Sequence, residues 1–276
     1  MRAFVSGAAL ALALSTAAFA QTAPATQDWR PLDLDNTLVI ETSKGRIVVE
    51  MSTIAAPEHV ERMKTLARAQ FYDGIVFHRV IPDFMAQTGD PQGTGAGGSE
   101  LPDLAAQFDF RRTLSIPFGE VTSERGVSTG FVGSLPVVTG SDDALVFTAA
   151  QAVPAWGAYC PGVLGMARQG EPNTANSQFY LMRGTERQLD HQYTAFGYVV
   201  QGLDVVYKLN PGEPPRTPDK MISVRIAADL PAAEQPRLEV MNARGAAFRA
   251  FIDKRKKEEG AGFDICSVQL PTRAAP

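Results

Sequence analysis

The chain has 276 residues, of which 45% are hydrophobic and 20% charged, and its formal net charge at pH 7 is −4. These values are typical of a globular protein of one or two domains, and the acidic balance argues against nucleic acid or an anionic membrane as the main partner. The three histidines and two cysteines show no metal-ligand spacing, so we expect neither a structural nor a catalytic metal.

The first twenty residues have the pattern of an export signal. Arg2 gives a positive start, residues 3–14 are apolar, and Ala18-Phe19-Ala20 is a small-x-small cleavage site. The alternative is an uncleaved membrane helix, but the apolar run is shorter than the roughly 18 residues that such a helix requires. We therefore expect residues 1–20 to be a signal peptide and residues 21–36 a linker. The mature protein would be periplasmic, without a membrane anchor.

A β-hairpin and a helix are predicted next. Residues 38–42 and 46–51 are rich in β-formers and are separated by Ser43-Lys44-Gly45, which is a hairpin signal. Pro57 suits the first turn of a helix that ends near Gln70. Apolar residues at helical spacing support that helix: Val60, Met63, Leu66 and Ala67.

Residues 77–90 place one arginine and one glutamine among apolar side chains at the period-2 spacing of a strand. Arg79 keeps its proton in proteins, so it is a fixed hydrogen-bond donor and a poor general acid or base. Phe84 and Met85 could form an apolar floor beside it, and Gln87 adds a neutral donor and acceptor. Taken alone, the arginine would be read as a surface residue whose stem covers core neighbours.

The complete string of residues 77–90 resembles the signature of the cyclophilins, the cyclosporin-binding family of peptidyl-prolyl cis/trans isomerases. The resemblance implies a mainly β protein, a closed antiparallel β-barrel capped by two helices. It also implies that Arg79 is the catalytic residue and that Phe84, Met85 and Gln87 bind the substrate. The implied isomerase domain covers residues 37–229 and requires no cofactor.

A glycine-rich run at residues 93–98 could be mistaken for a phosphate loop. It lacks the Gly-Lys-Ser/Thr ending and no helical pattern follows, so the nucleotide-binding interpretation is not favoured. Glycines at this place are better explained as allowing the backbone to pass close to a bound peptide.

The resemblance is interrupted at about residues 111–160 and resumes at Val163. The interrupting segment is rich in Val, Phe, Thr and Gly, too apolar for disorder, and is predicted to be an ordered, partly β insertion. In the resumed part the resemblance implies further substrate-binding residues, which are Ala167, Arg168, Gln178, Tyr180, Leu189 and Tyr193.

Gln188 falls where many cyclophilins carry the tryptophan that grips cyclosporin, and the only tryptophans of the chain are Trp29 and Trp156. Without that aromatic wall and its N–H donor, we expect weak cyclosporin binding.

Residues 230–276 lie beyond the resemblance and are predicted to be a helical extension. The apolar residues between 237 and 259 fall near one helical face, which indicates an amphipathic helix packed on the domain. A helix that binds a partner is the alternative.

Cys160 ends the insertion and Cys266 follows the predicted helix. Because an oxidising compartment favours pairing of an even number of cysteines, we predict a disulfide between them that ties both additions to the barrel. The alternative is two buried free cysteines that act as small hydrophobes.

The function implied by these residues is isomerisation of X-Pro bonds in exported, unfolded or partly folded polypeptides. Rotation about such a bond breaks no covalent bond, so it needs only a donor near the prolyl nitrogen and an apolar slot for the ring. A non-catalytic proline-binding or chaperone module is the main alternative, and a structural envelope protein a weaker one. Only catalysis gives a reason to keep the arginine together with the pocket.

Overall fold

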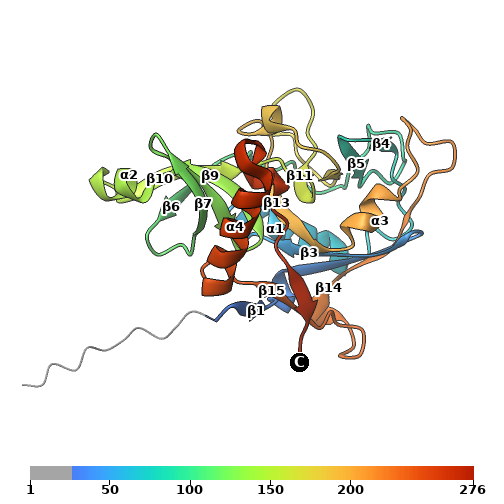
Figure 1. Cartoon of the computed structure of the whole chain (residues 1–276). Coiled ribbons are helices and arrows are strands. Elements are labelled where there is room, and N and C mark those ends of the chain that lie inside the picture. The colour runs from blue at the N-terminus through green and yellow to red at the C-terminus, as the bar shows by residue number, and fades with distance from the viewer. Residues whose placement is uncertain (1–26) are drawn as a thin grey trace, which may run out of the picture.

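The computed structural model describes residues 27–276, so the predicted signal peptide and the first part of the linker lie outside it. Its largest element is an antiparallel sheet of eight strands in the order β14-β2-β3-β13-β11-β12-β5-β4 (Figure 1). The strands are β2 (Thr37–Thr42), β3 (Gly45–Met51), β4 (Arg79–Ile81), β5 (Met85–Thr88), β11 (Val163–Met166), β12 (Phe179–Met182), β13 (Ala195–Gln201) and β14 (Met221–Ile226).

The main sheet curls but does not close into the predicted barrel. Its edge strands β4 and β14 are joined by no continuous ladder, and a single bridge links Val76 to Lys220. Residues 74–77 meet residues 219–221 through backbone hydrogen bonds around this bridge, for example from Phe77 N–H to the Asp219 carbonyl at 2.8 Å. Since one bridge does not make a ladder, the sheet is an open half-barrel, and the structure does not show the predicted closed barrel.

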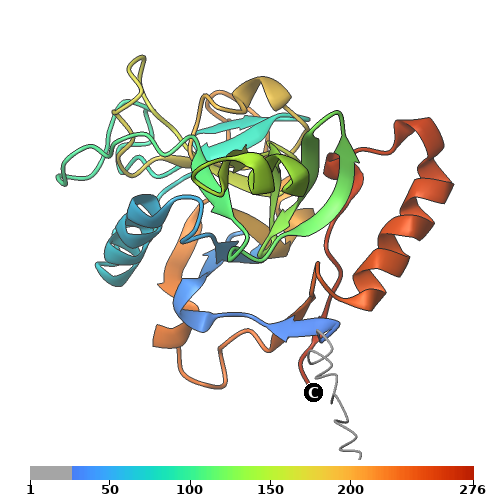
Figure 2. The ribbon, with the colours of Figure 1, turned by 90° about the vertical axis from the view of Figure 1, so that its left-hand side faces the viewer.

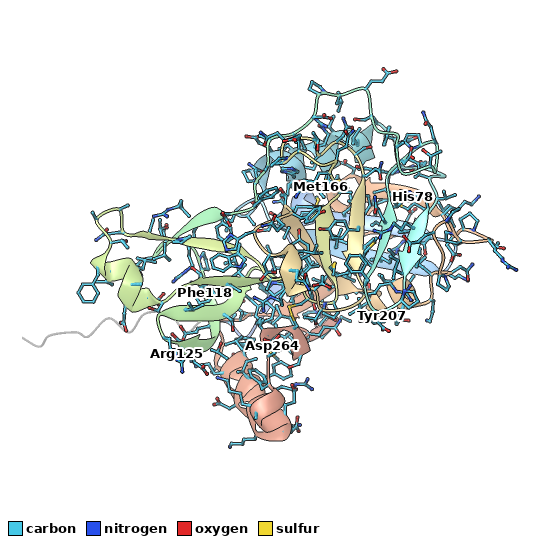
Figure 3. The ribbon with its side chains drawn as sticks, turned by 90° about the horizontal axis from the view of Figure 1, so that it is seen from above. His78, Phe118, Arg125, Met166, Tyr207 and Asp264 are labelled. Atoms are coloured by element: carbon cyan, nitrogen blue, oxygen red, sulfur yellow. A yellow bond between two sulfur atoms is a disulfide. The ribbon has the colours of Figure 1, made fainter. Side chains whose placement is uncertain are left out.

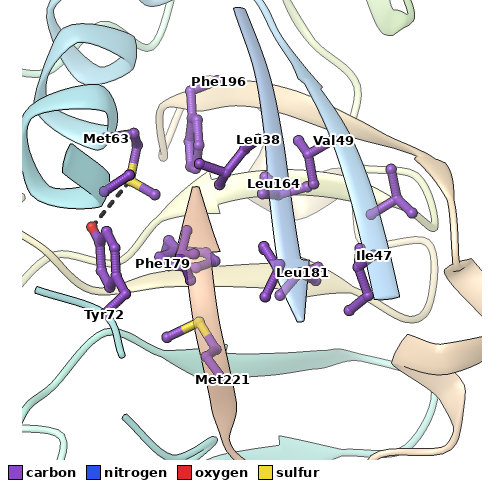
Figure 4. Packing of buried hydrophobic residues seen from close by; sticks show 14 of the residues in the cluster. Leu38, Ile47, Val49, Met63, Tyr72, Leu164, Phe179, Leu181, Phe196 and Met221 are labelled. Atoms are coloured by element: carbon purple, nitrogen blue, oxygen red, sulfur yellow. Dashed lines mark hydrogen bonds between the residues drawn. The ribbon is translucent and has the colours of Figure 1, made fainter. Parts of the chain in front are cut away.

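Helix α1 (Pro57–Arg68) lies where the sequence predicts it, and α3 (Leu203–Tyr207) is a second, shorter helix on the same sheet. Their apolar faces pack with the inward side chains of the main sheet into a first core. Figure 4 shows this packing around Met63 and Tyr72, whose hydroxyl donates a 3.2 Å hydrogen bond to the Met63 sulfur. The first core therefore depends on the helical stripe that the sequence predicts.

The insertion forms a second antiparallel sheet in the order β6-β10-β9-β8-β7. Figure 3 shows it extending to one side of the main sheet, with a short helix at its far end. Its elements are β6 (Phe110–Thr113), β7 (Gly119–Glu124), β8 (Val127–Val132), β9 (Leu135–Gly140), α2 (Asp142–Phe147) and β10 (Ala152–Gly157). Short 3-10 turns are found at Leu34–Asn36, Arg187–Leu189, Ala227–Asp229, Gly260–Gly262 and Ile265–Ser267.

The C-terminal extension differs from the prediction of one helix from 237 to 259. Residues Leu238–Met241 form strand β15, and helix α4 covers only Ala246–Glu259. Strand β15 pairs with β1 (Trp29–Pro31) on one side and with β16 (Thr272–Ala274) on the other. Backbone pairing with segments distant in sequence therefore overrides the helical spacing. The same pairing gives order to residues 29–31, which were predicted to belong to a linker.

A second core covers the outer face of the main sheet. It combines outward residues of the sheet, such as Val163 and Tyr198, with apolar residues of the insertion and the extension. Phe131 of β8 meets Phe248 of α4 edge-on, with ring centroids 6.0 Å apart. Figure 2 shows α4 along the flank of the molecule opposite α1. Both additions are thus packed on the sheet as parts of one folded unit.

Cys160 and Cys266 form the predicted disulfide, which closes a loop of 106 residues. Cys160 is buried in the second core, directly before β11, and Cys266 lies in the 3-10 turn after α4. The bond therefore joins the extension to the main sheet. None of the helices in residues 27–276 has the length and apolar character that crossing a bilayer requires.

Removal of the disulfide through the double change Cys160→Ala and Cys266→Ala should lower the free energy of unfolding by about 2–5 kcal/mol, because the unfolded chain regains the freedom of a long loop. Urea denaturation of the two proteins measures this difference. Reduced wild-type protein is the control and should unfold like the variant. Two reactive thiols in denatured but unreduced protein would contradict the bond.

Candidate functional site

A pocket of about 170 Å³ opens on the outer face of the main sheet, between β4 and β5 and the segments that follow β11 and β12. It is lined by nine residues, all of them predicted from the sequence: Arg79, Phe84, Met85, Gln87, Ala167, Arg168, Tyr180, Leu189 and Tyr193. Gln178, the remaining predicted substrate-binding residue, lies beside this group and hydrogen-bonds Gln87.

The alternation of side chains along the strands brings these residues together. In β5, Ala86 points into the first core while Met85 and Gln87 point outward. In β12, Phe179 and Leu181 likewise point inward. Antiparallel pairing sets Tyr180 opposite Gln87, and Gln87 opposite Arg79. One row across three neighbouring strands therefore contains an arginine, a glutamine and a tyrosine.

Arg79 lies at the rim of the pocket with its side chain 37% exposed. Its guanidinium carbon is 5.7 Å from the centroid of the Phe84 ring. The Nε–H group donates a 2.6 Å hydrogen bond to the carboxylate of Glu213. Within residues 27–276 this is the one hydrogen bond of the guanidinium, so its two Nη groups still have donors for a ligand.

Tyr180 forms the floor of the pocket. It is buried, and its ring meets those of Tyr159 and Tyr193, each at a centroid distance of 6.0 Å. Burial raises the pKa of the Tyr180 phenol well above its ordinary value, so the phenol is neutral at any physiological pH. A Cβ atom at Gly165 would lie 2.5 Å from the Tyr180 ring, which explains the glycine on the neighbouring strand.

The insertion supports one wall of the pocket, a feature that the sequence does not reveal. The wall is the loop of residues 186–193, which contains Leu189 and Tyr193. The ring of Trp156 of β10 lies on that of His191 at a centroid distance of 3.8 Å, and a carboxylate oxygen of Asp109 contacts Nδ1 of the same histidine. The sequence shows a tryptophan, Trp156, among apolar β-formers of the insertion. Nothing in the sequence indicates that this tryptophan contacts His191 of the pocket wall.

A second, wider pocket of about 550 Å³ adjoins the first beyond Gln87. It is lined by the glycine-rich loop and by Gln178 and Arg168, among others. Gln178 donates hydrogen bonds to the carbonyls of Gly95 and Gly97, at 2.9 and 2.8 Å. Its side chain therefore holds the loop at the edge of the wider pocket.

Arg168 borders both pockets, but its side chain is bound to the protein itself. The guanidinium lies 4.5 Å from the Tyr193 ring centroid and donates to the carbonyls of Gln192, Gln169 and Gly170.

Gln188 is exposed in the turn next to Leu189. Weak cyclosporin binding stays a prediction, which a titration with the wild type and a Gln188→Trp variant would check.

Asp90 organises the glycine-rich loop. Its buried carboxylate accepts hydrogen bonds from the backbone N–H groups of Gln92, Thr94 and Gly95, and from the Thr94 hydroxyl. These donors are therefore satisfied by the protein's own carboxylate and are not free for a phosphate group.

Hydrogen bonds of this kind set the pKa of Asp90. Burial alone would raise it, but hydrogen bonds from the backbone of Gln92, Thr94 and Gly97 and from the Thr94 hydroxyl outweigh burial and lower the pKa to about 2. Since the folded pKa lies below the unfolded value of about 3.9, the carboxylate stabilises the fold above pH 4 and loses that effect as the pH falls toward 2.

The change Asp90→Asn should lower the free energy of unfolding at pH 7 by about 2–3 kcal/mol, because an amide cannot accept all of these hydrogen bonds. The difference in the free energy of unfolding between the wild type and the variant should become smaller as the pH falls from 4 to 2. Urea denaturation across this pH range measures both effects, with Asp143→Asn, a change at an exposed residue of α2, as the control. Equal stability of wild type and Asp90→Asn at pH 7 would contradict the account.

Comparison with known proteins places this chain in a family. The family model described as cyclophilin type peptidyl-prolyl cis-trans isomerase/CLD matches residues 37–228. A probable peptidyl-prolyl cis-trans isomerase of Brucella suis is 33% identical over 234 residues, which cover 79% of this chain and 96% of that protein. A peptidyl-prolyl cis-trans isomerase of Schizosaccharomyces pombe is 35% identical over 170 residues, or 62% of this chain and 82% of that protein.

The crystal structure of the cyclophilin AquaCyp293 from Hirschia baltica matches with a TM-score of 0.80 and 34% identity, covering 90% of this chain and 94% of that one. This likeness spans more of the chain than the family model does, so it includes residues outside 37–228. By its sequence, its fold and these relatives, the chain belongs to the cyclophilin-type peptidyl-prolyl cis-trans isomerases.

Proposed function

We propose that this isomerase acts on X-Pro bonds of exported polypeptides and assists their folding, with Arg79 as its catalytic residue. The observation that supports the proposal best is the pocket itself. It combines an arginine with free Nη donors, an apolar floor and a size suited to a small side chain.

The chemistry of the reaction fits these residues. Rotation about an X-Pro bond faces a barrier of about 18–20 kcal/mol, because the resonance between the prolyl nitrogen and the carbonyl must be lost. As the nitrogen becomes pyramidal it gains electron density, which a donor from Arg79 stabilises. Phe84, Met85, Tyr180 and Leu189 hold the ring while the preceding carbonyl rotates, and Gln87 with the backbone near Ala167 fixes the substrate chain. No bond is broken, so no nucleophile or cofactor takes part.

The donor matters more for the rate than the pocket does. Only interactions that are stronger in the transition state than in the ground state accelerate the step. In other enzymes a single preorganised donor lowers the barrier by about 3–4 kcal/mol, which is about 10²–10³ in rate. A module that only binds proline needs the apolar floor but has no use for Arg79, so the arginine favours catalysis over the binding-module alternative.

Export is proposed from the signal pattern of residues 1–20 and is supported by the disulfide, since such bonds are rare in the cytosol. Intact mass spectrometry of protein isolated from the periplasm tests it. The proposal predicts a chain that starts at Gln21 and is two hydrogens lighter than its reduced form. Full-length protein found only in the cytosol would contradict it.

The change Arg79→Ala should lower kcat/KM by about 10²-fold or more while the fold stays intact. Arg79→Lys should not restore activity, because a compact ammonium cannot present two donors in the place of the guanidinium fork. An assay on an X-Pro peptide, coupled to a protease specific for the trans form, measures the rates. Circular dichroism controls for folding. Near-normal activity of a folded Arg79→Ala protein would leave only the binding-module interpretation.

A further inference from the structure

We propose that Glu213 is a positioning residue for the isomerase reaction. It holds the Arg79 guanidinium through Nε–H, so that the Nη donors remain directed to the pocket. The inference rests on the proposed catalytic role of Arg79 and extends the site to a residue in the loop between α3 and β14.

The contact engages one end of the guanidinium only. The Glu213 Oε2 atom accepts the Nε–H hydrogen bond at 2.6 Å, and Arg79 itself borders the pocket. A carboxylate that bound both Nη groups would compete with a substrate for the same donors. Binding at Nε instead leaves those donors free and restricts the rotation of the side chain.

The loop of Glu213 is fixed to the strand of Arg79. Val80 of β4 and Gly212 exchange two backbone hydrogen bonds of 2.8 Å, one residue away from each partner of the ion pair. The base of the loop is closed by Asp219, which accepts a 2.8 Å hydrogen bond from Asn210 N–H. Gly212 has φ +147°, and a Cβ atom there would lie 2.5 Å from Pro215 Cα, so this turn requires a glycine. The carboxylate is therefore presented to Arg79 from a set position.

The expected effect is on rate and not on folding. The side chains of Arg79 and Glu213 are 37% and 52% exposed, so the pair adds little to stability. Without Glu213 the arginine would sample several rotamers, and only a fraction of the molecules would have the donors in place. Because the donor acts in the transition state, the loss should appear mainly in kcat, with little change in KM.

Two variants separate orientation from charge. Glu213→Ala removes the acceptor, and we expect it to lower kcat by about three- to tenfold while KM changes by less than about twofold. Glu213→Gln keeps an acceptor oxygen without the charge and should retain at least about half of the wild-type kcat. The matched control is Asp204→Ala. It removes an exposed carboxylate of α3 that lies 2.6 Å from the Lys208 ammonium group, and it should leave the rate unchanged.

The experiment uses the mature chain and measures exchange between the cis and trans forms of an X-Pro peptide by NMR, which allows enough enzyme to follow weak variants. In an Arg79→Ala background, Glu213→Ala should have no further effect, because the residue that it orients is absent. Circular dichroism and thermal unfolding check the fold of every variant.

Three results would overturn the inference: an unchanged rate in folded Glu213→Ala, a faster rate in that variant, or an equal loss in the Arg79→Ala background. A faster rate would mean that the carboxylate holds the arginine away from the position that it needs for catalysis. If the wild type is active and Glu213→Ala is unchanged, only this inference fails. If the wild type is inactive, the proposed function fails and this inference with it.

Discussion

The alternation of side chains across the main sheet is the constraint on which the rest of the structure depends. In β12, Phe179 and Leu181 enter the first core, while Tyr180 and Met182 enter the second. Strands β3, β5, β11 and β13 divide their residues between the two cores in the same way. Because both faces of the sheet are apolar, neither can be left to water without a large cost from the hydrophobic effect. The helices cover the inner face, and the outer face needs a cover of its own.

The insertion and the C-terminal extension provide that cover, and the pocket that contains Arg79 lies where the cover ends. Met85 and Tyr180 belong to the second core and also border the pocket. Trp156 and Asp109 hold the loop that completes the pocket wall, and the disulfide fixes the extension next to β11. The insertion therefore helps to shape the site through Trp156, although no residue of either addition lines the pocket.

The sequence predicts four of the nine pocket residues from one local stretch, and the resemblance to the cyclophilins implies the other five. Residues 79–87 place the donor of Arg79 and the apolar side chains of Phe84 and Met85 on one short hairpin. Features that depend on distant partners could not be predicted. The spacing of residues 238–241 fits a helix, and only pairing with β1, about 200 residues away, makes them a strand. The contact of Glu213 with Arg79 likewise joins residues 134 apart in the chain.

The central claim is that the isomerase domain and its two additions form one cooperative unit. The two tryptophans make this testable, since Trp29 lies in β1 beside the extension and Trp156 in the insertion. Each of the variants Trp29→Phe and Trp156→Phe keeps one tryptophan, whose fluorescence follows the unfolding of its surroundings in urea. Far-ultraviolet circular dichroism and isomerase activity are measured on the same samples. The account predicts that within each protein all transitions coincide. A fluorescence change at lower urea, before activity and secondary structure are lost, would show that an addition unfolds independently and would contradict the claim.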